Sequence, residues 1–256
     1  MTKILTGAAL ALACATATAA PAPASATSIA DCDGPFATVL QAGAASDARA
    51  YWLDRRLIQW PAAGTDASDG VFKLYYSATA QVRATTGARV TGADGALLLA
   101  AATAPAPAGL AARFKFIGKG PLLAVAAPDA ARIPDLLTGQ LLLVREAADG
   151  TVLDATTAQL PGALDDLYAS AANTANLGVT VDAKAARFKL WAPTAQRVAV
   201  CSYATGSAKA AAITTMARDA ATGIEAFSFG DPTPVLEHAD ILDCLDAGSG
   251  RRRGRW

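Results

Sequence analysis

The sequence predicts an all-β protein built from sandwich modules, and three observations support this class. Short stretches alternate apolar and polar residues, as in VFKLYYS (residues 71–77) and FKLWAPTAQRVAVCSY (residues 188–203), which is the period of a strand with one buried face. Turn signals such as Asp149-Gly150 separate these stretches at regular intervals. Prolines interrupt the alanine-rich runs that would otherwise favour helices. Many short strands with frequent turns are typical of sandwiches and argue against βαβ units.

The first structured stretch is expected in ARAYWLDRRLIQWP (residues 48–61), and ARFKFI (residues 112–117) repeats the alternation of a strand. The strongest local prediction is a hairpin. An apolar run over Leu141–Val144 meets Asp149-Gly150, and apolar residues return at Val152. Asp-Gly readily adopts the positive φ angles of a two-residue hairpin turn.

The periodicity changes after this hairpin. Apolar residues recur at helical spacing from Leu164 to Ala171, which predicts a short helix that ends before Gly178. This helical segment is the expected boundary between two modules.

The N-terminal segment, residues 1–26, is expected to be a secretory signal peptide. Lys3 supplies a positive charge, the apolar run over residues 4–20 is too short to cross a bilayer comfortably, and small residues fit a cleavage site. The mature protein is therefore expected to be secreted or periplasmic. A lipid anchor at Cys14 is disfavoured, because ALAC lacks the large aliphatic residue of a lipoprotein signal. Residues 27–47, rich in proline, alanine and small polar residues, are expected to form a linker.

Three cysteines, Cys32, Cys201 and Cys244, would remain after cleavage of the signal. An odd number of cysteines cannot form a closed disulfide framework. One bridge and one free thiol would suit an oxidising compartment. The spacing leaves the partners open.

The charge balance gives no support for a polyanionic partner. Lys+Arg and Asp+Glu number 22 each, so the net charge is zero, and neither a nucleic acid nor an anionic membrane is expected as a partner. Basic residues gather only at the C-terminus, in Arg251–Arg253 and Arg255. They are expected to be a solvated tail.

The sequence contains few residues or motifs that are typical of a catalytic site. It holds one histidine, His238, and has neither a G-x-S-x-G serine motif nor a phosphate-binding glycine loop. Asp165-Asp166 is an adjacent carboxylate pair, but neighbouring helical residues diverge by about 100°, whereas glycoside hydrolysis needs two carboxyl groups about 5 Å or more apart across one bond. A capping or solvated role is expected for this pair. We therefore predict no catalytic residue, metal site or cofactor.

Aromatic residues are the remaining candidates for a binding site. Trp52, Trp60 and Trp191 are the candidate carbohydrate-binding residues, because an exposed flat ring offers apolar area to a sugar. The alternative is that these rings belong to the core, where aromatic residues are common. The sequence favours the core for Trp191, which lies beside a strand break at Pro193, and leaves Trp52 and Trp60 evenly balanced.

Four phrases in a fixed order carry a resemblance: ARAYWLDRRLIQWP, VFKLYYS, VLDATTAQLPGALDDLYA (residues 152–169) and FKLWAPTAQRVAVCSY. They resemble pullulanase-type α-1,6-glucosidases, the bacterial starch-debranching enzymes of the α-amylase clan. The resemblance implies an N-terminal immunoglobulin-like β-sandwich over residues 48–165, a helical linker over 166–178 and part of a family 48 carbohydrate-binding module over 179–230. LWAPTAQRV is similar to the opening of that module, and MARDAATG (residues 216–223) is similar to its next turn.

The resemblance ends near residue 224. The family continues with further strands and a catalytic (β/α)₈ barrel, whereas residues 231–256 match nothing that the family implies and are expected to be an atypical, disordered tail. The second sandwich is therefore expected to be incomplete. A barrel needs about 200 residues or more, so enzymatic activity is implied for full-length relatives, and this chain is expected to be inactive by itself.

Three functions follow from these expectations. The first is a non-catalytic, exported N-terminal fragment of a debranching enzyme that binds α-glucan (starch, pullulan or glycogen) at most weakly. The second is a stand-alone glucan-binding protein. The third is a secreted adhesion or scaffold protein whose phrases resemble pullulanase by chance, since fold alone does not decide function.

Overall fold

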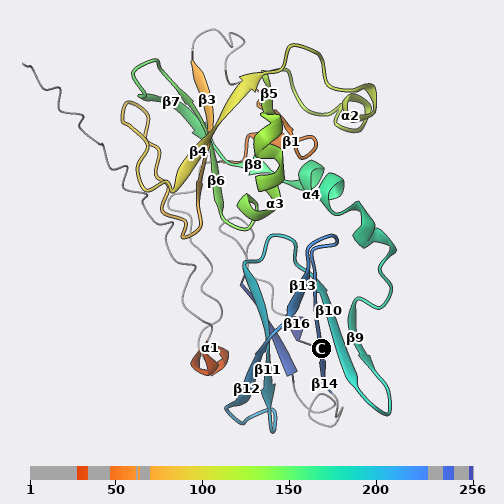
Figure 1. The fold of residues 1–256 in the computed structure, drawn as a ribbon. Helices are drawn as coiled ribbons and strands as arrows, with labels where there is room; N and C mark the ends of the chain where they lie inside the picture. The colour runs from red at the N-terminus through yellow and green to blue at the C-terminus, as the bar shows by residue number, and fades with distance from the viewer. Residues whose placement is uncertain are drawn as a thin grey trace, which may run out of the picture.

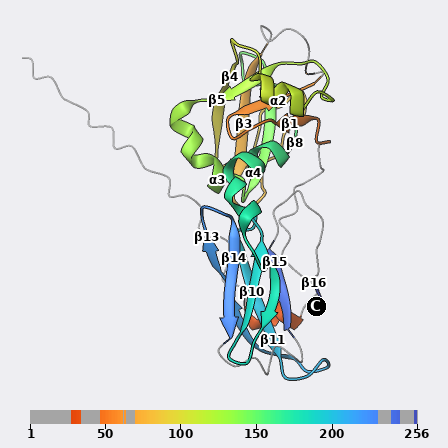
Figure 2. The ribbon, with the colours of Figure 1, turned by 90° about the vertical axis from the view of Figure 1, so that its right-hand side faces the viewer.

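The computed structural model describes residues 28–33, 47–61, 63, 70–229, 239–244 and 254–255. Two β-rich modules lie one above the other, with a short helical connection on one side (Figure 1). The turned view shows an elongated molecule (Figure 2). The predicted all-β class is confirmed.

The first module is one eight-stranded sheet with the strand order β7-β6-β3-β4-β5-β2-β1-β8. Its elements are β1 (Ala50–Trp52), β2 (Leu57–Gln59), β3 (Val71–Ser77), β4 (Gly95–Ala101), α2 (Ala108–Arg113), β5 (Leu122–Val125), a 3₁₀ helix (Ala127–Arg132), α3 (Ile133–Leu136), β6 (Gln140–Glu146), β7 (Val152–Thr156), β8 (Ala158–Gln159) and α4 (Pro161–Leu167). Strands β7 and β8 lie at opposite edges of the sheet, yet only Thr157 separates them in the chain. One continuous segment therefore joins the two edges, and the sheet curls into a barrel-like layer.

The core of this module fills the inside of the curled sheet. Trp52, Trp60, Leu74 and Leu143 are fully buried there, and α3 and α4 cover the core with Ile133, Leu137 and Ala163. Burial of such large apolar side chains is the main source of the stability of a small domain.

Arg49, just before β1, fixes the closure. Its guanidinium donates to both carboxylate oxygens of Asp154 on β7, at 3.0 and 2.7 Å, and to the carbonyl of Ala155 at 2.9 Å. It also lies 5.8 Å from the centre of the Trp60 ring. Partial burial disfavours the charged form of Asp154, but the hydrogen bonds and the charge of Arg49, with the Ala155 N–H and the charge of Arg145, together outweigh it, so the pKa of Asp154 is lowered. A bidentate arginine–carboxylate pair thus holds β1 against β7.

The predicted hairpin between β6 and β7 is present, with a longer loop than expected. The Ala147 N–H donates to the Thr151 carbonyl at 2.8 Å and the Gly150 N–H donates to the Ala147 carbonyl at 2.9 Å. Gly150 has a φ of 83°, which is the position that glycine takes after a type I turn in a three-residue hairpin loop.

The expected strand over residues 112–117 is wrong. Arg113 ends helix α2, and the Phe114 N–H still donates to the Leu110 carbonyl at 2.9 Å. Pro107 precedes the first residue of the helix, where proline is well tolerated. Alternation over so few residues also fits one helical turn.

The predicted helix near Leu164 is present but begins earlier, at Pro161, and a 3₁₀ helix (Ala169–Asn173) follows it. A proline in the first helical turn has a suitable φ and needs no hydrogen bond there. Gly162 allows close packing, because a Cβ at this position would lie 2.1 Å from the Trp52 carbonyl oxygen.

The second module is a sandwich of two four-stranded sheets, ordered β13-β14-β10-β9 and β12-β11-β15-β16. Its strands are β9 (Gly178–Val181), β10 (Ala186–Trp191), β11 (Arg197–Tyr203), β12 (Ala210–Thr215), β13 (Ala217–Asp219), β14 (Ile224–Phe229), β15 (Ala239–Cys244) and β16 (Gly254–Arg255). Phe188 from one sheet and Val198 and Val200 from the other are buried between the sheets.

Part of the expected tail adds to this sandwich. Residues 239–244 form β15, which pairs antiparallel with β11 in the register Arg197↔Cys244 to Ser202↔Ala239. The expectation that the whole tail lacks structure is wrong for these residues, because β15 takes the hydrogen bonds of an otherwise open strand edge. His238 and Arg251–Arg253 lie outside the described residues.

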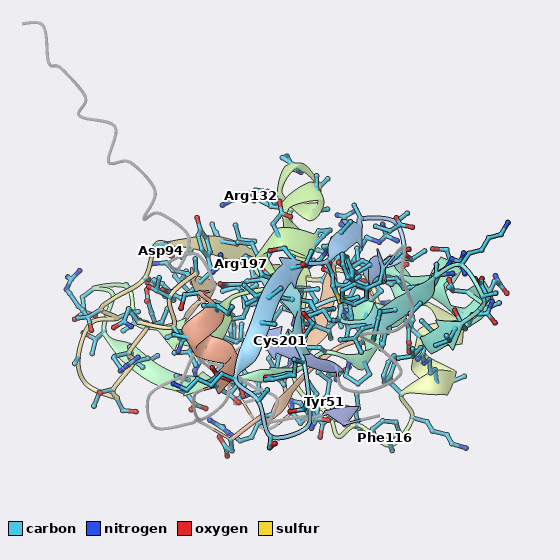
Figure 3. All side chains as sticks on the ribbon, turned by 90° about the horizontal axis from the view of Figure 1, so that it is seen from below. Tyr51, Asp94, Phe116, Arg132, Arg197 and Cys201 are labelled. Carbon is cyan, nitrogen blue, oxygen red and sulfur yellow. A yellow bond between two sulfur atoms is a disulfide. The ribbon has the colours of Figure 1, made fainter. Side chains whose placement is uncertain are left out.

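Part of the expected linker, residues 29–33, forms the short helix α1 (Ile29–Asp33). A disulfide joins Cys32 of this helix to Cys201 of β11, at a sequence separation of 169 residues. The Tyr203 hydroxyl donates to the Cys32 carbonyl at 2.9 Å, and the Ala210 N–H donates to an Asp33 carboxylate oxygen at 2.9 Å. The N-terminal segment is thereby attached to the second module (Figure 3).

We predict that Asp154→Asn lowers the free energy of unfolding of the first module by about 1–2 kcal/mol at pH 7, a value that allows for partial solvent screening. Because the pKa of Asp154 is lowered in the folded state, this contribution is present above the unfolded-state pKa and is lost as the pH falls through the folded-state value. Urea unfolding between pH 7 and pH 3 should therefore show that the difference in free energy of unfolding between wild type and variant becomes smaller as the pH falls. Asp129→Asn, at the exposed Arg132 pair, is the control, and an equal loss there would contradict the assigned role.

We predict that reduction of the Cys32–Cys201 bond lowers the free energy of unfolding of the second module by about 5 kcal/mol, the value that the chain-entropy model gives for a loop of 169 residues. Differential scanning calorimetry with and without reductant measures the effect. A Cys32→Ser/Cys201→Ser double variant should have the same melting temperature as the reduced wild-type protein, and reductant should not change that temperature. A reductant-sensitive melting temperature in the double variant would count against this bond as the cause.

Candidate functional site

Two of the three tryptophans singled out from the sequence are core residues. Trp52 and Trp60 are both 0% exposed, and the Trp60 ring packs edge-on against Phe72 with centroids 6.0 Å apart. Neither presents a ring face to solvent, so the alternative weighed for them, burial in the first module, is the one that the structure supports. Within the described residues neither indole N–H has an acceptor, as expected for rings held by packing alone.

Trp191, at the end of β10, is different. It is 41% exposed, and its indole Nε1–H donates to the Thr222 carbonyl at 3.0 Å. Its antiparallel partner across the sheet is Ile224, which is 5% exposed. One edge of the ring is therefore fixed by a hydrogen bond while part of the ring remains accessible.

Trp191 belongs to the outer face of its sheet. Phe188 and Leu190 of β10 pack in the core, and successive side chains of a strand point to opposite faces. Trp191 and Lys189 are thus on the outside. Residues paired directly across antiparallel strands share a face, which extends this surface, the Trp191 face, to neighbouring strands. It consists of Gly178, Thr180, Arg187, Lys189, Trp191, Ala217, Asp219, Ile224, Ala226 and Ser228.

The Trp191 face carries three charged side chains, Arg187, Lys189 and Asp219. The side chains beside Lys189 on β14 and β13 are small, namely Ala226 and Ala217, whereas Ile224 and Asp219 lie in register beside Trp191. Lys189 Nζ lies 3.5 Å from the Ala175 carbonyl. Asp219 is exposed, and the hydrogen bond from the Ala221 N–H lowers the pKa of its carboxyl group. The face therefore combines one accessible ring with Lys189, with Arg187 in its ion pair to Asp182, and with the ionised carboxylate of Asp219.

The turn between β13 and β14 is locked in place. Gly223 has a φ of 66°, and a Cβ there would lie 2.8 Å from Pro193. Arg218 donates to the carbonyls of Ala195 and Pro193 at 2.8 and 2.6 Å and to the Tyr168 hydroxyl at 3.3 Å. The Thr222 carbonyl that holds Trp191 is therefore part of a rigid turn.

The same contacts join the two modules. Tyr168 lies in the helical connection and is 4% exposed. Ser170 donates to the Ala221 carbonyl at 2.9 Å, and Gln196 donates to the Ala78 carbonyl of the first module at 2.8 Å. The orientation of the Trp191 face relative to the first module is thus fixed by hydrogen bonds from both sides.

The adjacent carboxylates Asp165 and Asp166 point to different partners. Asp165 forms an ion pair with Arg113 of α2. Asp166 accepts from the backbone and guanidinium of Arg55 at 3.0 and 2.7 Å, and this pair lowers the pKa of Asp166. The two residues fasten α4 to the first module through arginine ion pairs, and neither caps the helix as the sequence had suggested.

A buried carboxylate in the first module is also paired. Glu146 is 2% exposed and accepts from Lys73 Nζ at 2.7 Å and from the Tyr75 hydroxyl at 2.5 Å. The hydrogen bond to Glu146 raises the pKa of Lys73, and burial raises the pKa of Tyr75. This cluster satisfies a buried charge and leaves no free acid or base.

The part of the chain that the structure describes holds no group of three or more His, Cys, Asp or Glu side chains placed to bind a metal ion. No helix in the same part is long and apolar enough to cross a membrane.

Sequence reasoning identified Trp191 but missed Lys189 and Asp219. Lys189 stands two residues before Trp191 in a strand-like stretch, so strand alternation places both on one face. Asp219 lies in MARDAATG, and only the strand pairing of β13 with β14 brings it to the same surface.

The family comparison concerns the first module. Residues 47–166 match the family model described as the pullulanase N2 domain. The pullulanase of Klebsiella pneumoniae is 34% identical over 176 residues, which are 69% of this chain and 15% of that protein. The chloroplastic pullulanase 1 of Arabidopsis thaliana is 32% identical over 155 residues, 60% of this chain and 15% of the relative.

Solved structures extend the similarity beyond the N2 domain. The Klebsiella pneumoniae pullulanase complexed with maltotriose matches 83% of this chain and 19% of its own, with a TM-score of 0.66 and 26% identity. The apo form from the same organism covers 77% of this chain and 20% of its own, with a TM-score of 0.61 and 28% identity. Residues 47–166 are thus a pullulanase N2 domain, and the chain is homologous to the N-terminal part of pullulanases. It spans about 15% of the length of the curated relatives.

We predict that Trp52→Ala costs about 3–5 kcal/mol of stability, because it opens a large cavity in the core. Trp52→Phe should cost less than half as much, since it keeps most of the ring and removes an unpaired N–H. Trp191→Ala, at an exposed position, should cost less than about 1 kcal/mol. Chemical denaturation of the three variants measures their losses in free energy of unfolding. A larger loss for Trp191→Ala than for Trp52→Ala would contradict the assignment of Trp52 to the core and of Trp191 to the surface.

Proposed function

We propose that this chain is the exported, non-catalytic α-glucan-binding part of a pullulanase-type debranching enzyme, and that the second module is a family 48 carbohydrate-binding module whose contact residue is Trp191. The observation that carries the proposal is the accessible Trp191 ring, held by the Thr222 carbonyl on the outer face of its sheet. The homologous Klebsiella pneumoniae pullulanase, complexed with maltotriose in its solved structure, supports α-glucan as the ligand.

The chemistry of the Trp191 face suits a neutral sugar chain. A flat aromatic ring offers apolar area to the C–H face of a pyranose, while Lys189 and Asp219 can donate to and accept from hydroxyl groups. A single ring with few polar partners supports weak binding, because affinity depends on the few contacts that are fully desolvated.

The absence of hydrolysis is proposed from the state of the carboxylates. Asp165, Asp166 and Asp154 are each engaged by arginine, and Glu146 lies beneath Lys73 and Tyr75. A glycosidase needs a pair of carboxyl groups facing the two sides of one bond, and these side chains are committed to structural contacts instead.

Export is proposed from two observations. The N-terminal sequence has the pattern of a secretory signal, and a disulfide such as Cys32–Cys201 is typical of proteins in oxidising compartments. The mature chain is accordingly proposed to be secreted or periplasmic.

Native affinity electrophoresis in gels with and without amylopectin tests the proposal. Wild type should be retarded by amylopectin, and Trp191→Ala should weaken the retardation about three- to tenfold. Leu98→Ala, at a position that is 64% exposed on the first module, is the matched control and should migrate as wild type. If the wild-type chain migrates equally far with and without amylopectin, glucan binding is contradicted and a scaffold role is favoured. Release of reducing ends from pullulan by the purified chain would contradict the non-catalytic assignment.

A further inference from the structure

A second group of accessible aromatic rings lies on the first module, far from Trp191 in the sequence. Phe116, in the segment after α2, is 71% exposed. Its ring stands edge-on to Tyr51 of β1 with centroids 6.4 Å apart, and tilted to Phe114 at 6.2 Å. Tyr51 and Phe116 lie on the same side of the molecule in the view from below (Figure 3). The core of the module does not require these rings.

The segment that carries Phe116 is held by specific contacts. The Ile117 N–H donates to the Phe114 carbonyl at 2.9 Å, which forms a tight turn around Phe116. Gln59 Nε2 lies 3.4 Å from the carbonyl oxygens of Gly118 and Gly120. Gly120 packs so closely that a Cβ would lie 2.0 Å from the Trp60 carbonyl oxygen. The exposed ring is thus presented by a preorganised turn, which reduces the entropic cost of binding.

A row of polar side chains passes beneath these rings. Tyr51 pairs with Gln59 across β2 and with Gln159 across β8, so the three side chains lie side by side on the outer face of the sheet. Gln159 Nε2 donates to the Ala48 carbonyl at 3.2 Å, and among the described residues the amide oxygens of both glutamines accept no hydrogen bond. Two acceptors therefore flank the tyrosine ring.

We propose that this surface, formed by Tyr51, Gln59, Phe116 and Gln159 and called here the Tyr51 face, is a second carbohydrate-binding site that takes a neutral α-glucan chain. The identity of the sugar rests on the proposed function, while the site itself lies in the other module. Aromatic rings supply the stacking area, and the glutamine amides accept from sugar hydroxyls.

The surroundings favour a polysaccharide over a protein partner. Phe116 stands between the exposed, polar neighbours Lys115 and Lys119, so the accessible apolar area is small. Protein interfaces bury a broad apolar centre, whereas a sugar ring needs one or two aromatic faces and nearby hydrogen-bonding groups.

The test uses the full chain in native amylopectin gels. Phe116→Ala and Tyr51→Ala should each raise the apparent dissociation constant about three- to tenfold, and Leu98→Ala should not. In a Trp191→Ala background, residual retardation should persist and fall further with Phe116→Ala. Thermal melting checks that each variant is folded, and Phe116→Ala is the decisive one because its ring is largely exposed.

The outcomes separate this site from the Trp191 site. If Trp191→Ala weakens retardation and both Phe116→Ala and Tyr51→Ala leave it unchanged, the Tyr51 face is not a glucan site and the proposed function stands. If the Phe116 and Tyr51 variants weaken retardation and Trp191→Ala does not, the Tyr51 face is supported and the role of Trp191 fails. If Phe116→Ala changes the sedimentation coefficient of the chain and not its retardation, the face is a protein contact, and the proposal is overturned.

Discussion

The first module depends on the closure of its sheet. Strands β7 and β8 belong to one continuous segment but occupy opposite edges, so the sheet must curl until those edges meet. Arg49 secures this junction, since it binds Asp154 and Ala155 on β7 directly before the chain enters β1. The curled sheet buries Trp52 and Trp60 on its inner face. It also explains why the aromatic residues of the inner face are unavailable to ligands.

Two further sets of contacts fix the second module, one to the first module and one to the N-terminal segment. The helical connection is fixed at both ends, by Arg55 to Asp166 in the first module and by Tyr168 to Arg218 in the second. The Cys32–Cys201 bond then attaches the N-terminal segment to strand β11 of the second module. Because Arg218 also braces the turn that holds Trp191, the contacts that join the modules and those that orient the accessible ring share the same residues. The stability of the module junction and the orientation of Trp191 are therefore coupled at this turn.

The sequence predicted the regular strands well and the irregular parts poorly. VFKLYYS coincides with β3, and RVAVCSY coincides with β11, because strand alternation over seven residues is a strong signal. ARFKFI did not form a strand, since five or six alternating residues also fit the end of a helix. The burial of Trp52 could not be read from the sequence, because β1 is three residues long and its inner face is set by a closure between distant strands. The Cys32 pairing and the addition of β15 depend in the same way on contacts that have no local pattern.

The site was predicted only in part for the same reason. Trp191 and Lys189 share a strand and could be placed on one face, but Asp219 joins them through pairing that spans a turn. The Tyr51 face was not foreseen at all. It is assembled from β1, β2, β8 and the segment after α2, and no single stretch of sequence contains it.

The most direct test of α-glucan binding through an exposed ring is a ¹H–¹⁵N titration of the tryptophan indole resonances with maltoheptaose. The account predicts that the Trp191 Nε1–H resonance moves in a saturable manner, while those of the buried Trp52 and Trp60 stay in place. An unchanged Trp191 resonance at saturating sugar, or a shift of the two buried indoles in its place, would contradict it.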